Sequence, residues 1–177
     1  MQKVSYAEQI DADAPSRARH AIALEDIGNS LVQKGLDLWR EHANGRAMPS
    51  RTDLSPRVLS GLLRNTALLR VLDGGKEFET RISGDALVTA QGVSFQGKTT
   101  AEIDLMLPGY GSVLNSVYRY VTRTAKPAAY RGWYVREADG HSLYHESIVL
   151  PLSDDGRTVD HLLVVGAFAK QPGGILR

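Results

Sequence analysis

Apolar residues first recur at helical spacing in the segment that follows residue 28. Asn29-Ser30 form a good N-cap pair, and Asn44-Gly45 are typical of the C-terminal end of a helix. The pattern therefore predicts an amphipathic helix between them. Its apolar positions are Leu31, Val32, Leu36, Leu38 and Trp39. Residues up to about 20 are polar and have no sustained period. We therefore assign 1–28 to a leader that orders at most in part.

Two further elements follow before the middle of the chain. Residues 48–56 are rich in turn formers, and Ser55 and Pro56 can cap and begin a short helix that carries Val58, Leu59, Leu62 and Leu63. The apolar run 67–72, a turn at Asp73-Gly74-Gly75, and the alternation through Phe78, Thr80 and Ile82 then predict a β-hairpin.

The centre of the chain is predicted to be helical. Between Gly84 and Gly97, the apolar residues suit a short helix followed by a tight connection. From Gly109 to Thr124, one stripe of apolar residues has the spacing of a helix packed on one face. The stripe and its neighbours are Val113, Leu114, Val117, Tyr118 and Val121.

The last third of the chain changes to the pattern of strands. Three runs rich in Tyr, Val, Ile and Leu, at about 128–137, 142–152 and 158–169, are separated by Asp-Gly turns. The element order predicts an α+β fold: a five-stranded antiparallel sheet with helices on one face and an N-terminal amphipathic helix. We expect a single domain over 29–170 and a short tail over 171–177.

Several motifs in this order resemble those of a PAS-like family that is common in alphaproteobacteria and was long described as a domain of unknown function. The most specific is Pro49-Ser50-Arg51-Thr52-Asp53-Leu54-Ser55-Pro56. The others are Leu38-Trp39, Arg81-Ile82-Ser83-Gly84, Gly92 through Gly97-Lys98-Thr99, and Leu150-Pro151-Leu152-Ser153 with Asp155-Gly156. The resemblance covers about residues 30–168, and Asp85 stands where the family has a threonine after Gly84. It implies a PAS fold and a sensory or regulatory domain that often stands alone, with no family-wide catalytic residue.

Composition narrows the classes of function. A formal net charge of +1 gives no overall field to attract nucleic acid or an anionic membrane, so we expect no nucleic-acid partner. The chain has no cysteine, which excludes disulfides, thiolate metal sites and cysteinyl-flavin chemistry. No apolar run is long enough to span a bilayer, and we expect a cytoplasmic protein.

The five histidines do not have the spacing of a metal site. They are His20, His42, His141, His145 and His161. Neither Gly84–Gly97 nor Gly109–Thr124 contains a histidine that could serve as an axial ligand, so haem is disfavoured and the cofactor is unknown. The sequence has no Gly-x-Ser-x-Gly elbow for a serine nucleophile. We expect no enzymatic activity, although the fold alone does not exclude a small-molecule enzyme.

The leading hypothesis is a sensor that binds a small molecule under its helices. By strand alternation His145 shares a face with Leu143 and Ser147, and it is either a ligand contact or a satisfied core residue. The candidate ligand-binding residues are Leu87, Val117, Tyr118, Val121, Tyr134 and His145. The alternative is a ligand-free adaptor or dimerisation module with a filled interior.

For a second group of residues, the sequence leaves two roles open, one structural and one in binding a partner. Trp39 packs on the sheet or pairs with another copy, and Arg51 and Asp53 either fix the helix or present a polar corner to a partner. Arg81 lies on the solvent face or forms a buried ion pair near Asp53. Trp133 and Tyr134 point to opposite faces of one strand, and an exposed Trp133 would mark a homodimer surface. We expect a homodimer, a regulatory protein partner and a small-molecule ligand.

Overall fold

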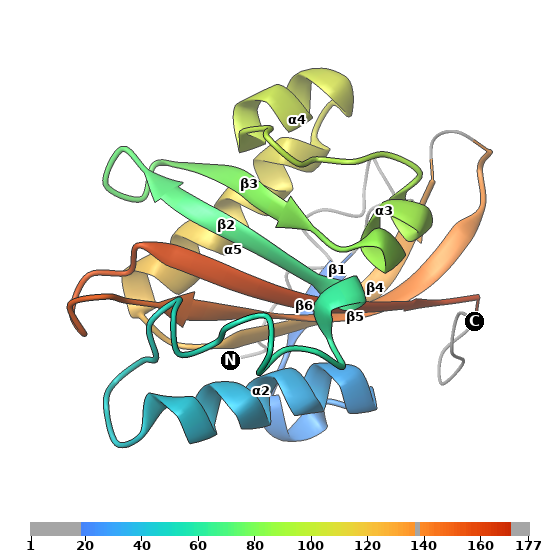
Figure 1. Ribbon diagram of the computed structural model, residues 1–177. Coiled ribbons are helices and arrows are strands. Elements are labelled where there is room, and N and C mark those ends of the chain that lie inside the picture. Colours follow the sequence, from blue (N-terminus) through green and yellow to red (C-terminus); the bar gives the residue numbers. More distant parts are fainter. Residues whose placement is uncertain (1–18, 137–138, 171–177) are drawn as a thin grey trace, which may run out of the picture.

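The computed structural model describes residues 19–136 and 139–170. Its centre is one six-stranded sheet in the order β1-β4-β5-β6-β2-β3, with every neighbouring pair antiparallel (Figure 1). The strands are β1 (Arg19–Ile22), β2 (Thr66–Leu72), β3 (Glu77–Ser83), β4 (Ala128–Val135), β5 (Ser142–Leu152) and β6 (His161–Ala169). The predicted α+β class with an antiparallel sheet is confirmed.

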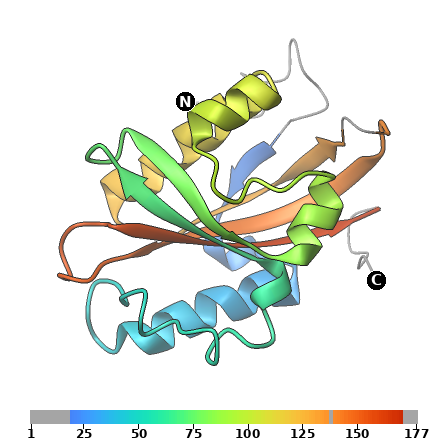
Figure 2. The same ribbon diagram turned by 45° about the horizontal axis from the view of Figure 1, so that its top comes forward.

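Helices cover both faces of this sheet (Figure 2). They are α2 (Ser30–Ala43), α3 (Asp85–Gln91), α4 (Thr100–Met106) and α5 (Tyr110–Thr124), with short 3-10 helices η2 (Leu24–Asp26) and η3 (Leu63–Asn65). On β6, Val165 lies against Gly35 of α2, whereas the next residue, Gly166, lies against Leu87 of α3. Successive strand residues point to opposite faces, so α2 packs on one face while α3 to α5 lie on the other.

The N-terminal helix forms as its sequence predicts. The Asn29 side chain accepts hydrogen bonds from the Leu31 and Val32 backbone amides, and this caps α2. One face of α2 is buried on the sheet, and its large buried side chains are Val32, Leu36 and Trp39. The indole Nε1 of Trp39 donates to the Pro151 carbonyl oxygen of β5 at 2.7 Å. The apolar stripe of α2 therefore packs on its own sheet.

The sheet has one strand more than the five predicted. β1 falls within the segment 1–28 that we assigned to the leader, and it pairs along β4 from Arg19 opposite Gly132 to Ile22 opposite Ala129. Ten residues of that segment, 19–28, thus belong to the folded part of the chain. Residues 1–18 and the predicted tail 171–177 lie outside the described residues.

The short helix predicted from Pro56 is wrong. The chain makes successive turns there and enters η3 only at Leu63. The Leu59 amide donates to the Ser55 carbonyl as in an α-helix, but the Leu62 amide donates to the Leu59 carbonyl, three residues back. Helical bonding therefore does not propagate. Leu59 and Leu62 are nevertheless buried, so the apolar pattern identified core positions correctly.

A helix that was not predicted, α4, follows α3. Thr99 and Glu102 form a capping box at its start, with the Thr99 side chain accepting from the Glu102 amide and the Glu102 side chain accepting from the Thr99 amide. The helix packs on α5.

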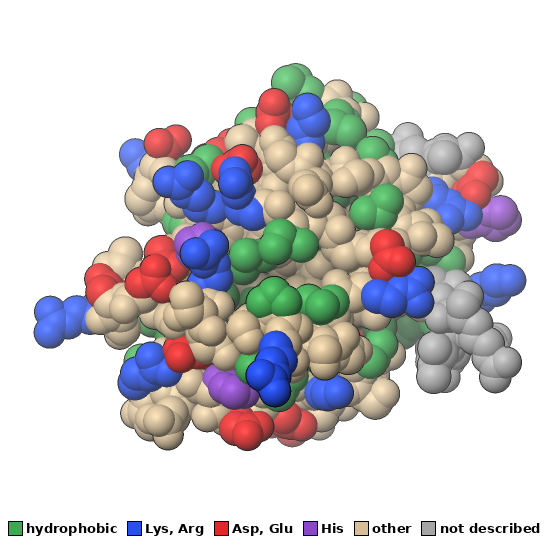
Figure 3. Space-filling view, viewed as in Figure 1, with side chains coloured by type: hydrophobic (Ala, Val, Ile, Leu, Met, Phe, Trp, Pro, Cys, Tyr) green, Lys and Arg blue, Asp and Glu red, His purple; other side chains and the backbone are tan. Residues whose placement is uncertain are grey.

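The surface carries charges of both signs. Figure 3 shows acidic and basic side chains interspersed over one face, with small groups of hydrophobic side chains near its centre. None of the helices in the described part of the chain has the length and apolar character needed to cross a membrane.

The contact between α2 and β6 gives a stability prediction. A Cβ atom at Gly35 would lie 2.8 Å from Cγ2 of Val165, which is closer than such atoms pack. Overpacking costs about 1–3 kcal/mol, whereas an alanine in a helix gains about 1 kcal/mol over glycine. We therefore expect Gly35→Ala to lower the free energy of unfolding by about 1 kcal/mol in urea titrations.

The matched control is the double variant with Val165→Ala, which removes the clashing methyl groups. The cost of Val165→Ala should be smaller in the Gly35→Ala background than in the wild type. Additive effects of the two substitutions would contradict the close approach of α2 to β6.

Candidate functional site

An interior cavity of about 70 Å³ lies between the sheet and helices α3 to α5. Its walls are mainly buried apolar and aromatic side chains from both layers. These include Leu69, Leu87, Phe95, Ile103, Tyr110, Leu114, Tyr118, Tyr134, Val149 and Phe168. Two buried basic side chains, Arg19 and His145, also line it.

A larger hollow of about 1430 Å³ lies on the outside, between β1, α5 and the β2–β3 turn. Most of the side chains around it are exposed or half-buried, as at Arg119, Tyr120 and Arg123. Small-molecule sites are usually concave and largely apolar, with a few placed polar groups. The interior cavity has this character, so we take it as the candidate site.

The sheet places both basic side chains in one row. Arg19 of β1 is opposite Gly132 of β4, Gly132 is opposite His145 of β5, and His145 is opposite Phe168 of β6. Residues directly opposite each other share a face of the sheet. Because Gly132 has no side chain, no side chain of β4 stands between Arg19 and His145 in this row.

His145 is 4% exposed and lies with its ring centroid 5.8 Å from that of Phe168. No other residue in the described part of the chain forms a hydrogen bond with its imidazole nitrogens. Burial lowers the pKa of His145 well below its usual value, and electrostatic interactions with Arg19 and His20 lower it further. The imidazole is therefore neutral near pH 7.

Arg19 is the second basic residue that lines the cavity, and it is 8% exposed. Its Nη2 donates to the Tyr110 hydroxyl at 3.4 Å, and its guanidinium carbon lies 5.5 Å from the centre of the Tyr110 ring. Its Nε is buried and has no hydrogen-bond partner among the described residues. Within the described ranges, no carboxylate lies at ion-pair distance from Arg19.

Aromatic contacts hold the wall of the cavity. The Tyr110 ring lies 5.9 Å from Phe95 and 5.5 Å from Tyr134, and Tyr134 lies 6.1 Å from Phe168. The Tyr134 hydroxyl donates to the Gln91 carbonyl oxygen at 3.2 Å, which ties β4 to the end of α3. These contacts fix the wall from both layers of the domain.

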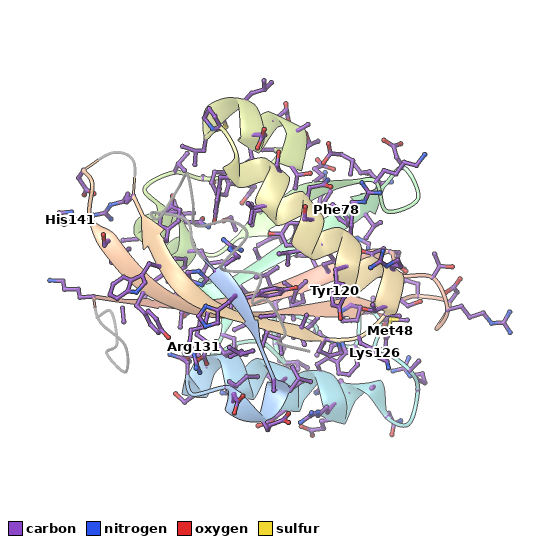
Figure 4. The ribbon with its side chains drawn as sticks, turned by 180° about the vertical axis from the view of Figure 1, so that it is seen from behind. Met48, Phe78, Tyr120, Lys126, Arg131 and His141 are labelled. Atoms are coloured by element: carbon purple, nitrogen blue, oxygen red, sulfur yellow. The ribbon has the colours of Figure 1, made fainter. Side chains whose placement is uncertain are left out.

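The opposite side of β5 holds the N-terminal end of α2. Glu146 is 6% exposed, and its Oε1 accepts hydrogen bonds from the Gly28 amide at 3.0 Å and the Asn29 amide at 2.7 Å. Arg131 donates to Glu146 Oε2 at 2.9 Å and to the Asp26 carbonyl at 2.6 Å. Figure 4 shows Arg131 beside this end of the helix. Adjacent residues of β5 thus face the cavity and α2.

Four of the six predicted ligand-binding residues line the cavity: Leu87, Tyr118, Tyr134 and His145. Val117 and Val121 are buried in the core but are not part of the cavity wall. Burial raises the pKa of the Tyr118 hydroxyl well above its usual value, so it is neutral.

Sequence reasoning missed Arg19, because it lies in the segment assigned to the leader. The segment Arg19-His20-Ala21-Ile22 has no strong strand pattern. Only its pairing with β4 identifies it as a strand.

The predicted structural and partner residues have separate roles. Trp39 is buried on the sheet, and Arg51 is exposed. Asp53 pairs with Arg46 and accepts from the Ser50 amide at 2.7 Å. The Ser50 amide is the main reason that the pKa of Asp53 is lowered to about 2. Asp53 therefore fixes the loop.

The alternative of a buried Arg81–Asp53 pair is wrong, because Arg81 lies at the surface and pairs with Glu79 of its own strand at 2.9 Å. Trp133 is 40% exposed and packs edge-on against Tyr144, with ring centroids 5.4 Å apart. No group of three or more metal-ligating side chains occurs within the described residues.

This arrangement of an antiparallel sheet, short helices and an interior cavity defines a PAS-like sensory fold. A family model for the PAS domain matches residues 30–168, so the chain belongs to the PAS domain family. No curated protein matches the sequence.

Three solved structures are similar to this chain. The PAS domain of Bordetella pertussis BvgS has a TM-score of 0.50 at 14% identity and covers 66% of this chain and 87% of its own. The light-oxygen-voltage protein of Rhodobacter sphaeroides has a TM-score of 0.46 at 9% identity, covering 66% of this chain and 70% of its own. An RNA-binding light-oxygen-voltage receptor has a TM-score of 0.46 at 15% identity. It covers 65% of this chain, which matches only 33% of the receptor. These likenesses concern the fold alone.

The neutral state of His145 gives a prediction on stability and pH. The unfolded chain protonates this histidine near pH 6.5, whereas the folded protein does not, so acid favours unfolding. From pH 7 to pH 5, the wild type should lose about 2 kcal/mol more unfolding free energy than the His145→Gln variant. Urea titrations at several pH values measure this difference, since other groups affect both proteins alike. Parallel pH curves for the two proteins would contradict a buried neutral imidazole.

Proposed function

We propose that this PAS domain is a sensor whose interior cavity binds a small molecule in signal transduction. The observation that carries the proposal is the buried Nε of Arg19, a residue of the cavity wall, which has no hydrogen-bond partner among the described residues. Buried polar groups are nearly always hydrogen-bonded, because leaving one unpaired costs free energy. A ligand in the cavity supplies the missing partner. The proposal is one of binding without catalysis, as is typical of PAS domains.

The size of the cavity restricts the ligand. An apolar cavity of about 150 Å³ holds one benzene ring. The fused rings of a flavin or a haem do not fit into about 70 Å³, and the sequence has no cysteine for a flavin adduct. The proposed ligand is therefore a molecule of a few non-hydrogen atoms.

The signal passes from the cavity to α2 through β5. His145 faces the cavity and its neighbour Glu146 holds the backbone amides of Gly28 and Asn29 at the start of α2. A ligand that shifts His145 also shifts Glu146, because the two share one stretch of strand. If the ligand binds the protein more tightly when α2 is in one of two positions, it raises the population of that position. A regulatory protein partner reads the position of this helix.

This path predicts the effect of Glu146→Gln. The substitution keeps the shape of the side chain but removes the charge that pairs with Arg131 and accepts from two amides. Hydrogen bonds to a charged group contribute about 1.5–3 kcal/mol each. We expect hydrogen exchange at the start of α2 to become faster by at least tenfold, while ligand affinity changes little. Arg136→Gln, which breaks an exposed pair with Asp139, is the control. Unchanged exchange at residues 28–32 in Glu146→Gln would contradict the path.

A second candidate function is a homodimer or adaptor surface. The exposed Trp133 and the half-buried Tyr144 lie side by side on the α2 face of the sheet, beyond the start of the helix. Aromatic residues of this kind are enriched in protein interfaces. The two functions are compatible, because this surface and the cavity lie on opposite faces of β4 and β5.

Native mass spectrometry of the protein purified from its own host tests the sensor function. We expect a stoichiometric small mass that is lost on denaturation. Ser147→Leu extends a cavity-lining residue into the space and should abolish the extra mass, while Ser116→Leu on the exposed side of α5 should retain it. Circular dichroism confirms that both variants fold.

Two results would overturn the sensor function. One is a wild-type protein with no small mass, especially if it appears as a bare dimer or with a polypeptide partner, which favours the adaptor. The other is a small mass that Ser147→Leu retains in full, which places the molecule outside the cavity.

A further inference from the structure

We propose that the ligand of the interior cavity is a small monocarboxylate, with its carboxylate held by Arg19 and its alkyl group against the aromatic wall. This inference rests on the proposed function, since it names the chemical class of molecule that the cavity binds. It assigns a role to Arg19 of β1.

Arg19 is a buried basic residue with no carboxylate at ion-pair distance among the described residues. The residue is 8% exposed, and within the described part of the chain its guanidinium donates only to the Tyr110 hydroxyl, at 3.4 Å. A buried ion is costly unless an opposite charge and good hydrogen bonds compensate for it. Arg131, the other partly buried arginine of this sheet region, has such compensation from Glu146 at 2.9 Å. Among the described residues, Arg19 has no such partner, and we infer that the carboxylate of a ligand supplies the counter-charge.

The geometry of Arg19 suits a carboxylate. Its Nε has no partner among the described residues, and the adjacent edge of a guanidinium presents two parallel N–H groups to two oxygen atoms. The Tyr110 ring, 5.5 Å from the guanidinium carbon, supports the plane of the group from one side. Gly132 lies between Arg19 and His145 and has no side chain, so no β4 side chain separates the two residues. The imidazole of His145 is therefore a second hydrogen-bond partner for the same anion.

The charge of the residues that line the interior cavity is suited to a ligand with one negative charge. None of the described residues that line the cavity is Asp or Glu. Burial lowers the pKa of His145 and raises the pKa of Tyr118, so both side chains are neutral near pH 7. Arg19 is thus the one charged group of the wall among the described residues, and one negative charge neutralises it.

The size and polarity of the cavity favour a short alkyl chain. Since about 150 Å³ holds the six carbons of benzene, about 70 Å³ holds roughly three to five non-hydrogen atoms. Acetate and propionate have this size. The wall is mainly apolar, with side chains such as Leu87, Phe95 and Phe168, and it favours an alkyl carboxylate over a fully polar anion such as nitrate.

The test compares propionate with propionamide, its neutral isostere, by isothermal calorimetry on the full chain. The wild type should bind propionate at least tenfold more tightly than propionamide. Arg19→Met keeps the apolar stem but removes the charge, and it should lose propionate affinity about 10- to 100-fold. Arg19→Lys, which keeps the charge but not the planar fork, should fall between them.

A second measurement separates a ligand-binding role from a structural role. Without any added anion, Arg19→Met should keep or raise the thermal midpoint, because it removes an uncompensated buried charge. The control Arg131→Met should lower the midpoint, because it leaves Glu146 buried without its cation. If Arg19→Met lowers the midpoint as Arg131→Met does, Arg19 has a structural partner and the inference is overturned.

The remaining outcomes distinguish this inference from the proposed function. Equal affinity for propionate and propionamide, or a native ligand without an acidic group, overturns the monocarboxylate while the sensor function stands. An affinity for propionate that is the same in Arg19→Met and the wild type also overturns the monocarboxylate while the sensor function stands. No binding of either probe, together with a host-purified protein that carries no small mass, overturns both.

Discussion

The structure depends on the burial of β5 on both of its faces. This strand is central in the part of the sheet that α2 covers from one side and α5 from the other, and from Ile148 to Leu152 its residues are almost completely buried. A strand in this position has no solvent side, so its polar residues need partners within the domain or within a ligand. Glu146 finds its partners at the start of α2, and His145 faces the cavity. The two sides of one strand thus carry the anchor of the helix and the candidate binding group.

Much of the fold could be predicted because local signals agreed with the final packing. The caps of α2, the turn between β2 and β3, and the alternation in the last three strands each specify one element without reference to distant residues. Residues 56–63 were misread because buried leucines in successive turns have nearly the spacing of a short helix. The capping box of Thr99 and Glu102 is a local sequence signal for the start of α4.

The candidate site was only partly predictable. Period and alternation indicate which face a residue lies on, and they placed Tyr118, Tyr134 and His145 toward the interior correctly. They do not distinguish a residue that fills the core, such as Val121, from one that borders an unfilled space, since both lie on the same helix stripe. Arg19 was out of reach, because a charged residue in a polar segment gives no sign that a distant strand will bury it.

The position of β1 at the edge of the sheet bears on how the cavity opens. Among the described strands β1 pairs only with β4, and edge strands of this kind open locally at a smaller cost than central strands. Each opening withdraws the guanidinium of Arg19 from the cavity wall. If a ligand binds Arg19 as proposed, its occupancy and the closed state of β1 are coupled in both directions. A fusion partner or antibody that pulls on the segment before residue 19 would act as an antagonist of the ligand without touching the cavity.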